Sequence, residues 1–167
     1  MNAEDAARPR LALSLVCRAR ARLSVLRLPA DALIPAFALS ALAARAPALA
    51  SATRTRAELS LILPTRLVPD SFADAGEAAG AGAQRREDGW ACLSLVPPGG
   101  EGAAIPFDMV GVLLAIARPL AAACVGIFAT STFNTDLVMV KAAQLERAAA
   151  ALRADGHAVE LLDEDGE

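Results

Sequence analysis

The chain has 167 residues, a length that fits one domain or two small ones. Apolar residues make up 55% of the sequence and aromatic residues only 4%, so the core has to be built from Leu, Val, Ile and Ala. Residues 1–60 carry nine arginines against four acidic residues, and residues 61–167 carry seven basic against fifteen acidic residues. A nucleic-acid-binding face needs basic residues interleaved with aromatic ones, and Phe37 is the one aromatic residue of the basic part, so we expect no nucleic-acid partner.

The mean hydropathy of +0.42 raises the question of a membrane protein. The most apolar stretch, residues 105–128, contains Asp108, Arg118 and two prolines, whereas a membrane-spanning helix needs about 20 mainly apolar residues. The weak apolar run at residues 11–16 is followed by Arg18 and Arg20 and by no small-residue cleavage site, which argues against a signal peptide. We therefore expect a cytoplasmic protein with no membrane partner.

The first half of the chain gives weak element signals. Residues 1–10 form a polar tail, and residues 11–20 fit a strand or a short helix equally well. The alternation of residues 23–28 predicts a strand, and a short helix is expected between Pro29 and Pro47. Residues 50–53 and 58–63 predict a hairpin that Pro64 stops, and the Ala-, Gly- and Asp-rich residues 68–88 predict a loop or linker.

The second half gives stronger signals. Strands are predicted at residues 90–96, 124–130, 136–140 and 157–162, and helices at residues 108–123 and 142–154. Asp108 is expected to cap the first helix, and Gly156 to end the second in the left-handed conformation. The order strand, helix, strand, strand, helix, strand is the ferredoxin-like βαββαβ pattern, so we predict an α+β fold with antiparallel sheets and both helices on one face.

Signatures of catalysis are missing from the sequence, which has neither a Gly-Lys-Ser/Thr phosphate loop nor a Gly-x-Ser-x-Gly elbow. His157 is the single histidine, and its position favours a surface or packing residue. Cys17, Cys92 and Cys124 are too widely spaced for a metal knuckle or a redox pair, so we expect core residues. We predict a protein that is not an enzyme, has no catalytic residues and uses no metal and no cofactor.

Two segments carry groups that can hold a small polar ligand. Residues 106–111 lie at a predicted helix start, where free backbone N–H groups can bind a carboxylate, and Gly111 permits close approach. Residues 131–136 carry hydroxyls, an amide and a carboxylate, which is more polarity than a hairpin needs. Each has a plainer interpretation: a capped helix with a glycine for close packing, and a turn satisfied by its own side chains.

These residues resemble those of the small bacterial ACT-domain proteins. The similarity is carried by residues 89–93, 105–107, 111–113, 127–136 and 138–141, and the Ser-Thr-Phe-x-Thr-Asp run at 131–136 is its most specific part. The resemblance extends, with less specificity, over residues 20–162, and it includes the ACT domains of the arginine sensor CASTOR and of aspartate kinase regulatory regions.

The resemblance implies tandem ACT-like units in one chain. Residues 1–20 would be an N-terminal tail or first strand, residues 21–88 a degenerate first unit with its linker, residues 89–162 the second ACT domain, and residues 163–167 an acidic tail. It also implies a non-catalytic regulatory role, with an amino acid or similar small zwitterion bound at an interface between ACT units. The ligand-binding residues expected by motif are Asp108, Met109, Val110, Gly111, Ser131, Thr132, Phe133, Asn134 and Asp136.

We expect the helix-start N–H groups to take the ligand carboxylate, Asp136 its ammonium or a cationic side chain, and Phe133 to cover its aliphatic part. Unpaired sheet edges further predict a homodimer. Two other functions stay open: a protein-interaction module that dimerises and binds no ligand, and a stand-alone remnant of an aspartate kinase-type enzyme.

Overall fold

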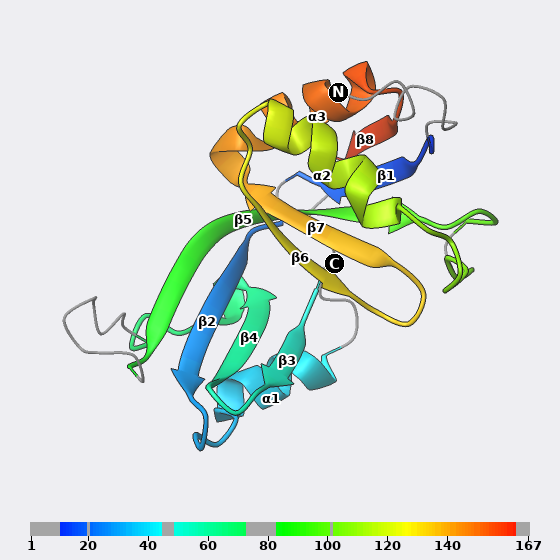
Figure 1. Ribbon diagram of the computed structural model, residues 1–167. Helices are drawn as coiled ribbons and strands as arrows, with labels where there is room; N and C mark the ends of the chain where they lie inside the picture. The colour runs from blue at the N-terminus through cyan, green and yellow to red at the C-terminus, as the bar shows by residue number, and fades with distance from the viewer. Residues whose placement is uncertain (1–10, 20, 45–48, 73–82, 101, 163–167) are drawn as a thin grey trace. The chain divides into compact units, whose positions relative to one another are not determined.

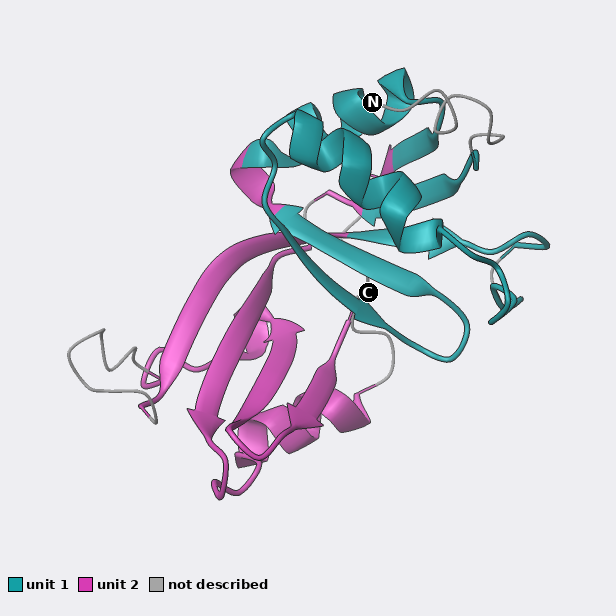
Figure 2. Ribbon diagram, in the orientation of Figure 1, with its two compact units in different colours: residues 1–17, 93–140, 144–160 teal, residues 18–92, 141–143, 161–167 magenta. Residues whose placement is uncertain are grey.

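The structure is a computed structural model that describes residues 11–19, 21–44, 49–72, 83–100 and 102–162 (Figure 1). The chain divides into two compact units (Figure 2). Unit 1 comprises residues 1–17, 93–140 and 144–160, and unit 2 comprises residues 18–92, 141–143 and 161–167. The predicted domain bounds at residues 20, 88 and 162 stay a prediction, and the predicted tails at 1–10 and 163–167 lie outside the described residues.

Unit 1 contains the ferredoxin-like order predicted from the second half. Its elements are β1 (Ser14–Arg18), the end of β5 (Arg85–Val96), α2 (Val112–Ala122), β6 (Ile127–Ser131), β7 (Asp136–Lys141), α3 (Leu145–Ala154) and β8 (Ala158–Leu162). The 3-10 turn η4 (Ala142–Gln144) connects β7 to α3. From β5 to β8 this is βαββαβ, which confirms the α+β prediction. Helices α2 and α3 lie side by side on one face of the sheet (Figure 1).

Strand β1 extends this sheet beyond the four predicted strands. The described strands of unit 1 are ordered β6–β7–β5–β1–β8, so β1 lies between the first and last strands of the βαββαβ unit. It pairs antiparallel with β5, from Ser14 opposite Val96 to Cys17 opposite Leu93. Leu15 and Cys17 are buried, which is the alternation of a strand with one face on the core, and this resolves the strand-or-helix ambiguity of residues 11–20.

Helix α2 begins four residues later than the sequence predicts. Its N-cap is Gly111, whose φ of 91° is left-handed, so the right-handed helix cannot continue backward through this residue to Asp108. The helical spacing of Val110, Leu113, Leu114, Ala117 and Leu120 favours one buried face, but the buried residues of α2 are Val112, Ile116, Pro119 and Leu120, so Leu120 alone agrees among the buried residues. Val110, Leu113 and Leu114, which have helical spacing in the sequence, are exposed instead.

Both helices of unit 1 end in the same backbone motif. After α3, Gly156 has a φ of 95° and the N–H of His157 bonds the carbonyl of Leu152, which confirms the predicted left-handed glycine. After α2, Cys124 occupies the equivalent position with a φ of 54°, and the N–H of Val125 bonds the carbonyl of Leu120. The prediction that Cys124 is a buried strand residue is therefore wrong: it is an exposed residue of the helix end.

Unit 2 is built from β2 (Leu23–Pro29), α1 (Ala36–Ala43), β3 (Ser51–Arg54), β4 (Glu58–Pro64), the 3-10 turn η2 (Thr65–Leu67) and the first residues of β5, with strands ordered β3–β4–β2–β5. The predicted hairpin is confirmed, with Ser51 opposite Ile62 and Arg54 opposite Leu59. Helix α1 packs on β4 and η2. The core is aliphatic apart from one aromatic ring and comprises Leu26, Leu28, Ala38, Ala41, Leu59, Leu61, Leu63, Val68 and Phe72.

A polar network joins three segments of unit 2. The buried Ser24 hydroxyl of β2 donates to Asp88 Oδ1 at 2.6 Å and lies 3.0 Å from the Thr65 hydroxyl of η2. Arg86 Nε contacts both carboxylate oxygens of Asp88, at 2.9 and 3.0 Å. Residues 85–88 belong to β5, and Arg85, Arg86 and Glu87 pair with β2. The prediction of a loop or linker from the Ala-, Gly- and Asp-rich composition of residues 68–88 is therefore wrong at this end.

Within the described part of the chain, none of the helices has the length and apolar character needed to cross a membrane.

Candidate functional site

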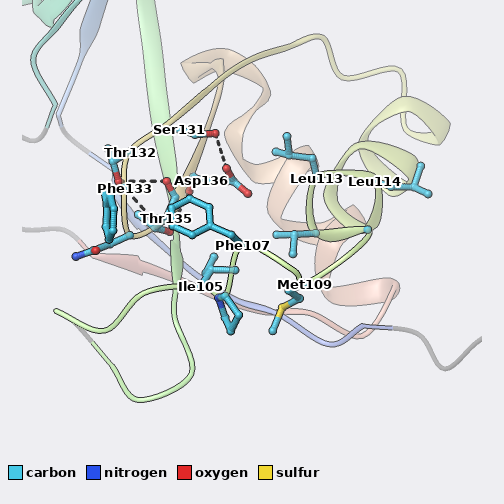
Figure 3. A pocket seen from close by; sticks show the side chains of 14 residues that line it. Ile105, Phe107, Met109, Leu113, Leu114, Ser131, Thr132, Phe133, Thr135 and Asp136 are labelled. Carbon is cyan, nitrogen blue, oxygen red and sulfur yellow. Dashed lines mark hydrogen bonds between the residues drawn. The ribbon is translucent and has the colours of Figure 1, made fainter.

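A pocket of about 520 Å³ lies in unit 1, a volume within the usual range of small-molecule sites (Figure 3). It is formed by the loop before α2, the first turn of α2 and the turn between β6 and β7. Its lining residues are Ile105, Pro106, Phe107, Met109, Gly111, Val112, Leu113, Leu114 and all six residues from Ser131 to Asp136. The two segments singled out in the sequence therefore meet within a single unit.

Seven of the nine predicted ligand-binding residues line this pocket: Met109, Gly111, Ser131, Thr132, Phe133, Asn134 and Asp136. Asp108 and Val110 are outside the lining, and both are exposed on the loop before α2. Binding of a ligand by the seven stays a prediction.

The first turn of α2 presents backbone donors at the pocket. The N-cap residue Gly111 has no side chain that could cap the helix, and the first turn of the helix has no acidic residue. The helical bonding begins with the Ala115 N–H, which donates to the Gly111 carbonyl at 2.9 Å. The N–H groups of Val112, Leu113 and Leu114 precede that bond, so they have no partner within the helix. Together with the helix dipole, they make this end of the pocket positive.

The β6–β7 turn uses much of its polarity internally. Ser131 donates a hydrogen bond from its hydroxyl to the Asp136 carboxylate, and the two residues are paired across the hairpin (Figure 3). The Thr132 hydroxyl donates to the Thr135 carbonyl at 3.2 Å and accepts from the Thr135 N–H at 3.2 Å. The Thr135 hydroxyl donates to the Leu95 carbonyl at 2.7 Å. The plainer interpretation of this turn thus accounts for the hydroxyls of Ser131 and Thr132, whereas the Thr135 hydroxyl ties the turn to β5. The carboxylate of Asp136 keeps acceptor capacity.

Sequence reasoning named Met109 and Phe133 on the apolar wall of the pocket but missed Phe107 and Leu113 as ligand-binding residues. Phe107 and Phe133 are 80% and 76% exposed and meet edge to face, with ring centroids 5.3 Å apart. Leu113 is 42% exposed and faces Asp136 across the pocket in Figure 3. Helical spacing alone predicts a core position for Leu113. The available signal was that Phe107 and Leu113 both lie in segments that carry the family resemblance, residues 105–107 and 111–113.

A second pocket of about 280 Å³ shares Thr132, Asn134 and Thr135 with the first. Its other lining residues come from β1, β5 and residues 97–103, and none of its lining side chains is ionisable. It has no counter-charge for a charged ligand. The larger pocket combines Asp136 with a helix N-terminus, and it is therefore the candidate site for a small molecule with both a positive and a negative group. No cluster of three or more potential metal ligands occurs among residues that the structure describes.

Comparisons with known proteins agree with this architecture. The ACT domain family model matches residues 85–154. Protein Atu0741 from Agobacterium tumefaciens has a similar structure, with 27% identity over 94% of this chain and 98% of that one, and a TM-score of 0.71. The regulatory subunit of aspartate kinase from Thermus thermophilus is 14% identical over 86% of this chain and 99% of its own, with a TM-score of 0.54. Aspartate kinase from Clostridium acetobutylicum is 16% identical over 84% of this chain and 34% of its own, with a TM-score of 0.56. A search of curated proteins found no match.

Proposed function

Because residues 85–154 of this chain are an ACT domain, we propose that the protein is a non-catalytic regulator that binds an amino acid or a similar small zwitterion in the pocket of unit 1. The likeness in fold to a regulatory subunit of aspartate kinase supports the regulatory role. The observation that carries the ligand proposal is the meeting of a helix N-terminus and a carboxylate in one pocket.

The two ends of the ligand bind to opposite charges. Its carboxylate accepts hydrogen bonds from the N–H groups at the start of α2, where the helix dipole favours an anion. Its ammonium donates to Asp136, in a charge-assisted bond that is stronger than a bond between neutral groups. Ser131 holds the Asp136 carboxylate in place from the opposite strand. Phe133 covers the aliphatic part of the ligand.

A thermal-shift experiment with the twenty amino acids tests this function. We expect at least one to raise the melting temperature in a concentration-dependent way, because a ligand that binds the native state stabilises it by mass action. The matched controls are the amine and the carboxylic acid that correspond to the binding amino acid, each lacking one charged group. Both should bind much more weakly, and equal binding of either would contradict the two-ended site. No shift with any amino acid would contradict the ligand proposal.

The exposed apolar rim also favours a second function, the interaction module that binds no ligand. Phe107, Val110 and Phe133 are each more than three-quarters exposed, and clustered exposed apolar groups mark interaction surfaces. In the first function, a second copy of the chain that packed on this rim would close the pocket at an ACT–ACT interface. Light scattering separates these cases: dimerisation without any amino acid response favours the interaction module, and dimerisation strengthened by an amino acid favours the regulator.

A further inference from the structure

We propose that the amino acid bound in this pocket has an uncharged, apolar side chain. This inference rests on the function proposed above and names the class of ligand. The first argument is the distribution of charge: Asp136 is the one ionisable side chain among the 14 lining residues. The pocket therefore offers one carboxylate and one helix N-terminus, which is what the ammonium and carboxylate of the amino acid backbone need.

A third charge on the ligand would have no partner. The side-chain carboxylate of aspartate or glutamate would find no cationic side chain in the lining and would lie in the same pocket as Asp136. The second cation of lysine or arginine would compete with the α-ammonium for the single carboxylate. A charge laid against the apolar wall would lose water and gain no partner there, so both classes are disfavoured relative to an apolar side chain.

Polar uncharged side chains gain little here either. The hydroxyl hydrogens of Ser131, Thr132 and Thr135 are already donated, to the Asp136 carboxylate and to the carbonyls of Thr135 and Leu95. The remaining polar side chain of the lining is the Asn134 amide, on the exposed turn.

The rest of the wall is apolar and open to solvent, so a ligand can gain by covering it. Ile105, Phe107, Met109 and Leu113 lie around the pocket on the side of the α2 loop, and Phe133 meets Phe107 edge to face (Figure 3). Burial of these side chains by an aliphatic or aromatic ligand side chain is favourable in proportion to the apolar area removed from water. The volume of about 520 Å³ does not select by size within this class.

Two ligand pairs of matched shape test the inference by calorimetry. Leucine and aspartate have side chains of the same branching, and norleucine is lysine without its side-chain ammonium. We expect leucine to bind at least about 10-fold more tightly than aspartate, and norleucine at least about 10-fold more tightly than lysine. If aspartate or lysine binds as tightly as its apolar counterpart, this inference is wrong while the proposed function stands. If no amino acid binds, the proposed function itself fails.

A variant supplies a test in the same protein. Met109→Arg places a cation on the apolar wall and should change the leucine-to-aspartate affinity ratio by about 10-fold or more in favour of aspartate. Met109→Leu is the matched control and should keep the wild-type ratio. Unfolding in urea checks that both variants are folded. An unchanged ratio in folded Met109→Arg would show that the ligand side chain does not lie against this wall and would overturn the inference.

Discussion

His157 donates a hydrogen bond to a backbone carbonyl that Pro119 leaves without its helical partner. Pro119 lies inside α2 and has no N–H to offer Ala115, four residues earlier. His157 Nε2 lies 3.1 Å from the Ala115 oxygen, and Nδ1 accepts from the Leu13 N–H at 3.2 Å. These two bonds define a neutral imidazole with its hydrogen on Nε2. The single histidine therefore joins the segment before β1, helix α2 and the start of β8.

A double-mutant cycle tests this relationship. His157→Ala removes the partners of a part-buried carbonyl and a part-buried N–H and also empties a buried side-chain position, so it should lower the free energy of unfolding by about 2–4 kcal/mol. In a Pro119→Ala background the N–H of residue 119 can bond Ala115, so the same His157→Ala change should be about 1 kcal/mol less destabilising. Urea unfolding of the four proteins measures the coupling. Glu160→Ala, an exposed change in β8, is the control and should stay within about 0.5 kcal/mol of wild type. If the effects of the two substitutions on the free energy of unfolding are additive, the inference that His157 replaces the missing N–H of residue 119 at the Ala115 carbonyl is wrong.

Cys124 offers a stabilising substitution. A residue with a Cβ costs roughly 1–2 kcal/mol in the left-handed region, and Cys124 has a φ of 54° there while its side chain is exposed. Cys124→Gly should therefore raise the free energy of unfolding by about 0.5–1 kcal/mol, after the larger chain entropy of glycine is allowed for. Cys124→Ala is the matched control because it removes the thiol and keeps the Cβ. A gain of equal size in Cys124→Ala would assign the effect to the thiol and contradict the backbone argument.

Asp88 should make the stability of the protein sensitive to acid. Burial raises the pKa of Asp88, but hydrogen bonds from Arg86 and Ser24 and the charges of Arg86 and Lys141 lower it more, so the pKa lies below its ordinary value. A carboxyl with a lowered native pKa contributes stability that is present above the unfolded pKa of about 3.9 and is lost as pH falls through the native pKa. We expect Asp88→Asn to be less stable than wild type at pH 7, with the difference shrinking below about pH 4. Asp31→Asn, at an exposed position, is the control. A difference that is constant from pH 7 to pH 2 would contradict the charge argument.

The sequence predicts most of the elements of this fold and only part of their boundaries. The β6–β7 hairpin, α3 and the left-handed Gly156 are dictated by local patterns, and the structure confirms them. The start of α2 was predicted four residues too early because the Asp108 cap signal is local, whereas Gly111 determines the start through a backbone conformation that composition does not reveal. The place of β1 between β5 and β8 depends on pairing across some 80 and 140 residues, which no local pattern encodes.

The sequence predicted the polar residues of the candidate site together with Met109 and Phe133, and it missed the rest of the apolar wall, including Leu113. Ser131 and Asp136 stand out in the sequence because a hairpin rarely carries so many polar groups, and they do line the pocket. Leu113 has the spacing of a core residue, and only the rotation of α2 about its axis decides that it faces the pocket. That rotation is set by the burial of Val112 and Ile116 against the rest of unit 1, a tertiary property.

Replacing Asp136 tests the ammonium site directly. Asp136→Asn keeps the shape of the side chain and removes its charge, so the fold should persist while the ligand ammonium loses its partner. Truncating one member of a desolvated charge pair costs about 2–5 kcal/mol, so we expect the affinity for the amino acid with the largest melting shift to fall by roughly 30-fold or more. Calorimetry on the wild type and the variant measures it.

Ser131→Ala is the matched control for this substitution, because it removes the hydrogen bond that Asp136 accepts within the hairpin and leaves the charge in place. We expect a small drop in melting temperature and an affinity within a few-fold of wild type, since the helix N-terminus and the carboxylate are both retained. If Asp136 serves only its own turn, the two variants will behave alike: each will melt earlier, and neither will change affinity. An Asp136→Asn protein that is folded and binds with wild-type affinity would remove Asp136 from the site.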